Sequence, residues 1–157
     1  MQLETTRFGT IDIDPDSVIT LTQPILGFQE FRRFIKLPGP SEFLTWLQST
    51  DSGELAFILL DPRSVIPDYK ADLTKQELSE LAVSSVAELE VYTLVVVPPD
   101  RSQIRTNLRA PILISPKHRL GKQIILERSD YPIQYFLAQH QPGQGQPQEV
   151  SNARTDA

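Results

Sequence analysis

Short runs of alternating apolar and polar residues recur along most of the chain and predict β-strands. In FLTWLQSTDSGELAFIL, residues 43–59, two apolar arms flank a polar turn at residues 50–53, and this pattern is typical of a hairpin. Similar runs indicate further strands. The expected strands span residues 2–8, 10–13, 17–21, 31–37, 43–49, 55–60, 91–97, 104–108, 111–115 and 122–127.

One segment, residues 71–85, has helical spacing instead. Thr74 and Glu77 lie three residues apart, as in a capping box at a helix start. Apolar residues at helical spacing follow and are expected to form one stripe toward the core: Leu78, Leu81 and Ala82. Many short strands around a single helix predict a mostly β fold, an antiparallel pseudo-barrel capped by one short α-helix.

Composition divides the 157 residues into one folded domain, residues 1–137, and a tail, residues 138–157. The tail is rich in Gln, Pro and Gly and has few bulky apolar side chains, so we expect it to be disordered. No apolar run approaches the ~20 residues of a membrane-spanning helix. The first residues also lack the pattern of a signal peptide, and we expect a cytoplasmic protein.

Several kinds of catalytic or metal site find little support in the residues. The chain has no cysteine and only two histidines, His118 and His140, whose spacing matches no common metal-ligand pair. Asp51-Ser52-Gly53 has the letters of the aspartic-protease triplet, but it occurs once, after polar residues, and a turn explains it. We therefore expect no enzyme activity, no metal and no cofactor.

Binding of nucleotides or RNA is an alternative. Arg101 and Arg105 have the spacing of a two-arginine anion clamp, although positions four apart also share one face of a strand. Barrels often present basic strands to single-stranded RNA, but residues 98–130 contain no aromatic residue for base stacking. A small-ligand or RNA-binding β-barrel module stays open as the alternative function.

Charge is distributed unevenly along the chain. Residues 1–90 contain 15 acidic and 7 basic residues, a net charge of -8, whereas residues 91–137 contain 3 acidic and 7 basic residues, a net charge of +4. Such an acidic half is commonly only a solvated surface, but it also attracts basic partners.

The order of several short motifs resembles that of the flagellar assembly factor FliW family. The motifs are Gly27-Phe28, FLTWLQS at residues 43–49, Ala56-Phe57, Asp61-Pro62, Pro67-Asp68-Tyr69, NLRAPI at residues 107–112, Gln123 and YPIQY at residues 131–135. Two departures from the family pattern are the approach to Gly27 at residues 21–26, and Ser115, where the family often has Asn.

This resemblance implies a pseudo-barrel capped by a helix, which agrees with the strand pattern. It also implies a cytoplasmic protein that binds flagellin before export and, when free of flagellin, binds the translational regulator CsrA and relieves its repression of flagellin translation. The activity would be partner exchange without catalysis, cofactor, membrane or direct contact with nucleic acid.

The acidic half suggests where CsrA would bind, because CsrA-type regulators bind RNA through basic surfaces. We expect Asp68, Glu77 and Glu80 to supply the electrostatic attraction and Tyr69 to supply a packing anchor. The alternative is that Asp68 caps a turn, Tyr69 belongs to the core, and the glutamates form an ordinary solvated helix face.

Two further expectations concern single positions. Pro111 removes a backbone donor from its predicted strand, which favours an edge strand, and an edge at Pro111 and Asn107 could accept a flagellin segment. A bend that closes the barrel is the alternative. We expect Trp46 to be a core residue, since an exposed Trp46 would instead be a candidate interface anchor.

Overall fold

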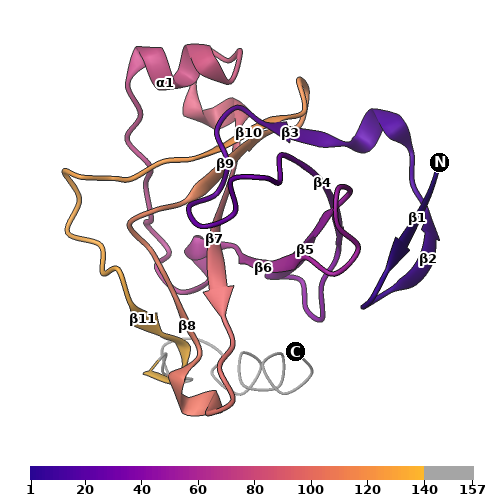
Figure 1. Cartoon of the computed structure of the whole chain (residues 1–157). Coiled ribbons are helices and arrows are strands. Elements are labelled where there is room, and N and C mark those ends of the chain that lie inside the picture. Colours follow the sequence, from indigo (N-terminus) through magenta and orange to yellow (C-terminus); the bar gives the residue numbers. More distant parts are fainter. Residues whose placement is uncertain (140–157) are drawn as a thin grey trace.

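The computed structural model describes residues 1–139 of the chain (Figure 1). The strands are β1 (Gln2–Thr5), β2 (Gly9–Asp12), β3 (Ile19–Leu21), β4 (Arg33–Pro38), β5 (Leu44–Ser49), β6 (Ala56–Leu60), β7 (Glu90–Val96), β8 (Arg105–Thr106), β9 (Ile112–Ser115), β10 (Leu120–Gln123) and β11 (Tyr135–Phe136). The helix α1 spans Lys75–Glu80, and short 3-10 turns lie at Pro15–Ser17, Pro62–Ser64, Val86–Glu88, Arg101–Gln103 and Leu137–Gln139.

Seven strands form a closed barrel in the order β7-β6-β5-β4-β3-β10-β9, and β9 pairs back onto β7. The closing ladder aligns Glu90 with Ile114 and Tyr92 with Ile112. The predicted mostly β fold with a barrel and a single helix is confirmed. One detail differs from the predicted antiparallel arrangement, because β3 and β10 pair in parallel. The last two strands, β8 and β11, extend the sheet beyond β7.

Apolar side chains fill the inside of the barrel. They come from five of its strands and one loop, and the buried members are Ile19, Leu21, Ile25, Phe34, Leu47, Leu59, Ile112 and Ile114. Phe57 joins them and makes an edge-to-face contact with Phe28, with ring centroids 4.9 Å apart. Because a strand alternates its faces, Leu47 points inward while Trp46 points to the outside.

A second apolar cluster covers the outer side of β9. Leu113 belongs to this cluster, whereas its neighbours Ile112 and Ile114 belong to the barrel interior. The cluster also includes fully buried Leu81, Ile104 and Leu108. Strand β9 is therefore buried on both faces, and the segments that follow β6 and β10 pack onto it.

The helix α1 begins as the capping-box spacing predicts. The Thr74 side chain accepts a hydrogen bond from the Glu77 amide, and the Glu77 side chain accepts one from the Thr74 amide. Leu81 is fully buried, but the predicted apolar stripe is wrong at Ala82, which is exposed. The helix has already ended there, since Ala82 adopts a left-handed conformation with φ of 60°.

The hairpin of β1 and β2 forms a separate two-stranded sheet beside the barrel (Figure 1). The Phe8 ring makes an edge-to-face contact with Trp46, with centroids 5.5 Å apart, and the Arg7 guanidinium lies 4.6 Å from the centre of the Trp46 ring. Trp46 is half-buried and lies outside both apolar clusters. The expectation that it is a core residue is therefore wrong.

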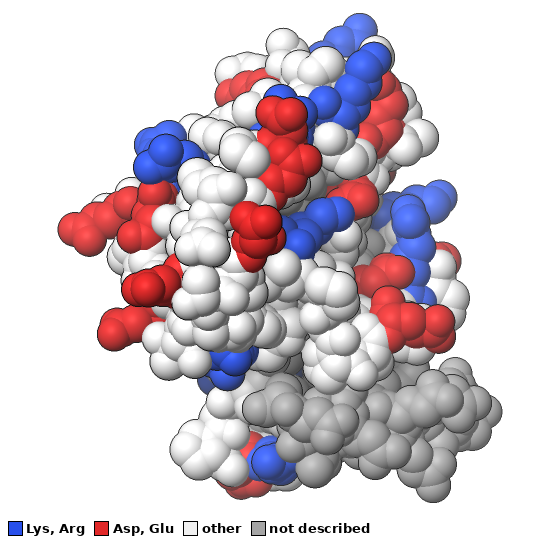
Figure 2. All heavy atoms as spheres, turned by 90° about the vertical axis from the view of Figure 1, so that its right-hand side faces the viewer, with Lys and Arg blue, Asp and Glu red and all other residues white. Residues whose placement is uncertain are grey.

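Positive and negative side chains lie side by side on the face that carries this hairpin (Figure 2). The Arg33 guanidinium forms an ion pair with the Asp51 carboxylate at 2.7 Å. The two-residue strand β11 and the turn Leu137–Gln139 were not expected from the sequence. The tail predicted for residues 138–157 lies outside the described residues from residue 140 onward.

Candidate functional site

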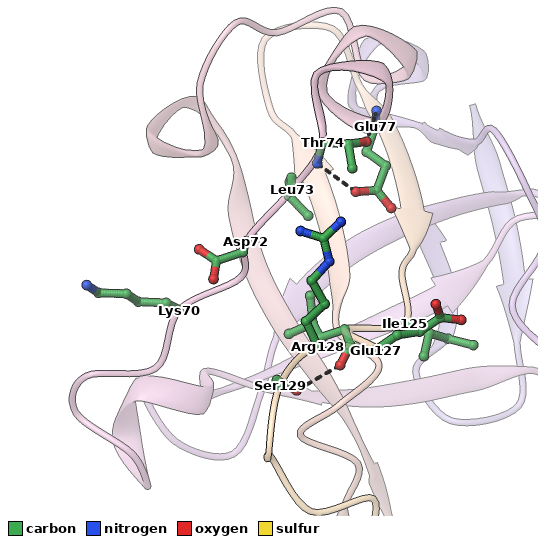
Figure 3. A pocket seen from close by; sticks show the side chains of 10 residues that line it. Lys70, Asp72, Leu73, Thr74, Glu77, Ile125, Glu127, Arg128 and Ser129 are labelled. Atoms are coloured by element: carbon green, nitrogen blue, oxygen red, sulfur yellow. Dashed lines mark hydrogen bonds between the residues drawn. The ribbon is translucent and has the colours of Figure 1, made fainter.

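A surface pocket of about 440 Å³ lies between two chain segments (Figure 3). The first segment leads from the turn after β6 into α1, and the second follows β10. The lining residues are Lys70, Asp72, Leu73, Thr74, Glu77, Ile125, Leu126, Glu127, Arg128 and Ser129. The pocket thus joins parts of the chain about fifty residues apart in the sequence.

Local hydrogen bonds hold both walls of this pocket. In the first wall, the Thr74 amide donates to Glu77 Oε1 at 2.8 Å. In the second wall, the Ser129 hydroxyl donates to the Leu126 carbonyl at 2.8 Å. The Arg128 side chain extends from the second wall toward Thr74 and Glu77 (Figure 3). Buried Leu126 anchors this wall in the second apolar cluster.

Charged groups without partners give the pocket its electrostatic character. Three carboxylates and two cations line it, and four of these side chains form no hydrogen bond or ion pair with another described residue: Lys70, Asp72, Glu127 and Arg128. Exposed ions of this kind keep their full hydration and can exchange water for a partner's charges. The apolar side chain of Ile125, which is 52% exposed, lies among them.

Two of the predicted contact residues, Asp68 and Tyr69, lie in the turn just before this pocket. Asp68 is exposed and without a side-chain partner among the described residues. Tyr69 is only 1% exposed, donates a hydrogen bond to the Leu108 carbonyl at 2.6 Å and stacks on Tyr131 with centroids 4.4 Å apart. Its placement matches the alternative that Tyr69 belongs to the core, so its ring is not available as a packing anchor.

The two predicted helix glutamates have different surroundings. Glu77 is half-buried, lines the pocket and is engaged in the capping box. Glu80 forms an ion pair with Lys122 of β10, which offsets part of its charge. Glu77 therefore lines the pocket and Asp68 precedes it in the chain, but only Asp68 has a carboxylate free of other described groups.

The predicted edge at Asn107 and Pro111 is wrong. Pro111 is buried and precedes β9, which pairs with β10 on one side and β7 on the other. The Pro111 carbonyl accepts a hydrogen bond from the Ile124 amide at 2.9 Å. Asn107 is half-buried, and its side chain accepts a hydrogen bond from the Arg109 amide at 3.0 Å. Both residues shape the bend before the closing strand, as the alternative states.

Four charged pocket residues were missed by the sequence reasoning: Lys70, Asp72, Glu127 and Arg128. A signal for the last two exists in the polar run ERSD, residues 127–130, between the apolar runs around it. Such a run predicts a loop, but its spatial neighbour cannot be read from the pattern. Within the described residues, no group of three or more His, Asp or Glu side chains is placed to hold a metal ion.

Comparison with known proteins adds to this geometry. A model of the FliW protein family matches residues 2–137. The chain belongs to the FliW family. The family that the order of the motifs predicted is thereby confirmed, and the match spans every strand from β1 to β11.

Individual relatives support the same assignment. A protein named flagellar assembly factor FliW from Thermoanaerobacter pseudethanolicus is 34% identical over 159 residues, which covers 100% of both chains. Another with this name from Moorella thermoacetica is 38% identical over 139 residues, covering 87% of this chain and 88% of the relative. A crystal structure described as the flagellar assembly factor FliW superposes with a TM-score of 0.78 and 30% identity, covering 87% of this chain and 96% of the other.

Among residues 1–139, no helix has the length and apolar composition that a membrane crossing requires.

Proposed function

We propose that this protein is a cytoplasmic flagellar assembly factor that binds flagellin and, when free of flagellin, binds a CsrA-type translational regulator. Binding CsrA would relieve its repression of flagellin translation. The observation that carries the proposal is the FliW family match over residues 2–137. The relatives that cover this chain are themselves named flagellar assembly factors.

The pocket face is the proposed contact surface for CsrA. It carries the unpartnered carboxylates of Asp72 and Glu127 and an exposed Ile125. The unpartnered carboxylate of Asp68 lies in the turn that leads into it. Carboxylates at an interface rim accelerate association with a basic partner, and an apolar side chain beside them adds buried area. Glu77 and Glu80 are less suitable because the helix cap and Lys122 already engage them.

A pair of charge reversals tests this surface. Asp68→Lys combined with Asp72→Lys is expected to weaken binding of the cognate CsrA at least about tenfold in isothermal titration, because attraction becomes repulsion. Neither side chain forms a hydrogen bond with a described residue, so the fold is expected to persist.

The matched control is Glu30→Lys combined with Glu54→Lys. Both glutamates are exposed, lie outside the pocket and have no side-chain partner among the described residues. This control changes the net charge by the same amount, so an equal loss in both double variants would contradict a local contact. If the double variant at Asp68 and Asp72 bound CsrA with unchanged affinity, the pocket face would be excluded as the contact surface.

The exchange of partners needs its own titration. CsrA is titrated into the wild-type protein with and without saturating flagellin, and the proposal expects flagellin to abolish or strongly reduce the CsrA signal. Absence of binding to either correctly folded partner would contradict the proposed function. Tight, salt-dependent binding of single-stranded RNA would then favour the alternative barrel module.

A further inference from the structure

A second groove crosses the outside of the barrel at the parallel junction of β3 and β10. Its volume is about 440 Å³. Thr20 of β3 is aligned with Arg33 of β4 on one side and with Leu120 of β10 on the other. All three residues line the groove, which therefore runs across three neighbouring strands.

Cationic side chains stand at the two ends of this groove. Arg33 lies at the β4 end, while Arg119 lies in the turn before β10. No Asp or Glu is among the described residues that line it, although the whole chain has a net charge of -5. The floor between the cations is largely apolar, with side chains from Pro15, Val18 and Leu120.

The backbone holds Arg119 firmly in place. Its amide donates to the Ser115 carbonyl at 2.7 Å, and its carbonyl accepts from the Thr20 amide at 2.9 Å. Its φ of 55° lies in the left-handed region that favours glycine. The Arg119 guanidinium forms no hydrogen bond or ion pair with another described residue, so its full donor capacity faces the groove and solvent.

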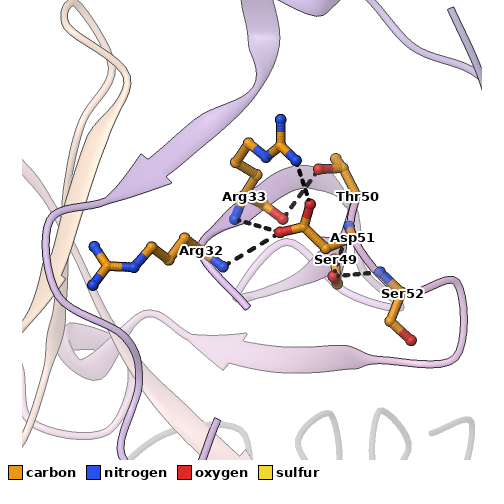
Figure 4. Close-up of polar contacts among 6 residues, drawn as sticks. All are labelled: Arg32, Arg33, Ser49, Thr50, Asp51 and Ser52. Carbon is orange, nitrogen blue, oxygen red and sulfur yellow. Dashed lines mark hydrogen bonds and ion pairs between the residues drawn. The ribbon is translucent and has the colours of Figure 1, made fainter. Parts of the chain in front are cut away.

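At the other end, Arg33 is oriented by Asp51 (Figure 4). Arg33 Nη2 donates to Asp51 Oδ1 at 2.7 Å, and the Arg33 amide donates to Asp51 Oδ2 at 3.3 Å. The guanidinium has five N–H donors in a planar fork. Its pairing with one carboxylate leaves donors for a second one.

We propose that this groove binds an extended, acidic peptide segment of a partner protein, with Arg33 and Arg119 each binding one carboxylate across the apolar floor. Neighbouring strands lie ~4.8 Å apart, so the backbone at Arg33 on β4 and the backbone at Arg119, just before β10, are separated by ~10 Å. An extended polyproline-type segment places side chains three positions apart on one side at a separation of ~9 Å. The preferred segment therefore has two acidic residues three positions apart with an apolar residue between them.

The width of this groove and its apolar floor favour a peptide over a single phosphate as the ligand. A lone oxyanion is best bound by donors that converge on one point, whereas these two arginines stand at opposite ends of an apolar strip. The groove also differs in charge from the pocket beside α1, which has three carboxylates in its lining. The inference does not depend on the proposed binding of CsrA or flagellin.

The test uses the full chain and a dye-labelled hexapeptide with blocked ends. The probe has two glutamates three positions apart, separated by proline and leucine, and the control probe has glutamines instead. Fluorescence anisotropy is expected to give a Kd below ~1 mM for the glutamate probe. The glutamine probe is expected to bind at least about tenfold more weakly, because charge-assisted hydrogen bonds are lost.

Arg119→Gly is the decisive variant, since glycine accepts the left-handed conformation and the turn is preserved. This variant is expected to bind the glutamate probe at least about tenfold more weakly than the wild type does. Arg128→Gln removes the same charge at the other pocket and is expected to leave probe binding unchanged. Unchanged binding by Arg119→Gly, equal binding of both probes, or no binding of either would overturn the inference. Inorganic phosphate that binds more tightly than the probe would overturn it in favour of a small-oxyanion site.

Discussion

Tyr69 illustrates at the residue scale how a polar group is held inside this protein. Its ring is buried against Tyr131, and its hydroxyl donates to the Leu108 carbonyl. Burial of the Tyr69 hydroxyl raises its pKa well above the ordinary value, and the charge of Tyr131 makes a smaller contribution in the same direction. The neutral phenol is therefore a requirement of the folded state, because the phenolate would be desolvated and would lose the donor.

This burial predicts a loss of stability at alkaline pH. The folded state holds the Tyr69 proton more tightly than the unfolded state does, so the stabilisation is complete below pH ~10 and declines as the pH rises toward the folded-state pKa. The free energy of unfolding should fall by up to ~1.4 kcal/mol per pH unit above pH ~10 from this residue alone.

Urea unfolding between pH 8 and 11 checks the decline. Tyr69→Phe removes the ionising group and should show a shallower decline than the wild type, despite a lower stability at pH 8 from the lost hydrogen bond. Tyr92 contributes in the same direction, since burial and then Glu90 raise its pKa. Parallel pH curves for the wild type and Tyr69→Phe would contradict the role of Tyr69.

At the scale of elements, the β1–β2 hairpin depends on a close approach to the turn between β5 and β6. The Thr6 amide donates to the Gly53 carbonyl at 3.0 Å. A Cβ atom at position 53 would lie 2.1 Å from the Glu4 carbonyl oxygen, which no side chain can occupy. Glycine is therefore required there for the hairpin to cover Trp46.

Gly53→Ala is expected to displace the hairpin and expose Trp46, the single tryptophan of the chain. Loss of the Phe8 contact and the Arg7 cation contact should shift Trp46 emission to longer wavelength and destabilise the protein by ~1–3 kcal/mol. Ser52→Ala in the same turn is the control, because the Ser52 side chain has no partner among the described residues. An unchanged emission spectrum of Gly53→Ala would show that the hairpin accommodates the methyl group.

The existence of most elements could be predicted, but their bounds and surroundings could not. The alternation in FLTWLQS indicated β5, and the Thr74 and Glu77 spacing indicated the helix start. The strand expected at residues 122–127 is instead β10 at Leu120–Gln123. This strand ends with its partner β9, at the pair of Gln123 and Ile112, and the Ile124 and Leu126 amides still donate to the carbonyls of Pro111 and Arg109.

At the scale of the whole molecule, the pairing of β7 with β9 closes the barrel. These strands are aligned at residues 90–92 and 112–114, and their side chains join both apolar clusters. The β1–β2 hairpin, in contrast, forms a separate sheet with two unpaired edges. Regions with few buried contacts open locally at a lower free energy than the core does.

Native-state hydrogen exchange should therefore separate these two regions. Amides in the β7–β9 ladder are expected to exchange only through global unfolding. Amides of β1 and β2 should exchange through local opening, whose free energy should be at least ~2 kcal/mol lower than that of global unfolding. Urea at concentrations below the unfolding transition should accelerate the ladder amides more than the hairpin amides. Equal protection of both regions would mean that hairpin and barrel open as one unit.

The local pattern of this sequence was sufficient for most of the strands, the helix start, the mostly β class and, through the motif order, the FliW family. These features depend on short periods and on spacing along the chain. The tertiary structure alone decided the parallel β3–β10 pair, the buried position of Pro111, the outward position of Trp46 and the union of residues 70–77 with 125–129 in one pocket. Pairing and packing between distant segments decide these features, and the periodicity of a single segment does not specify which distant segment covers it.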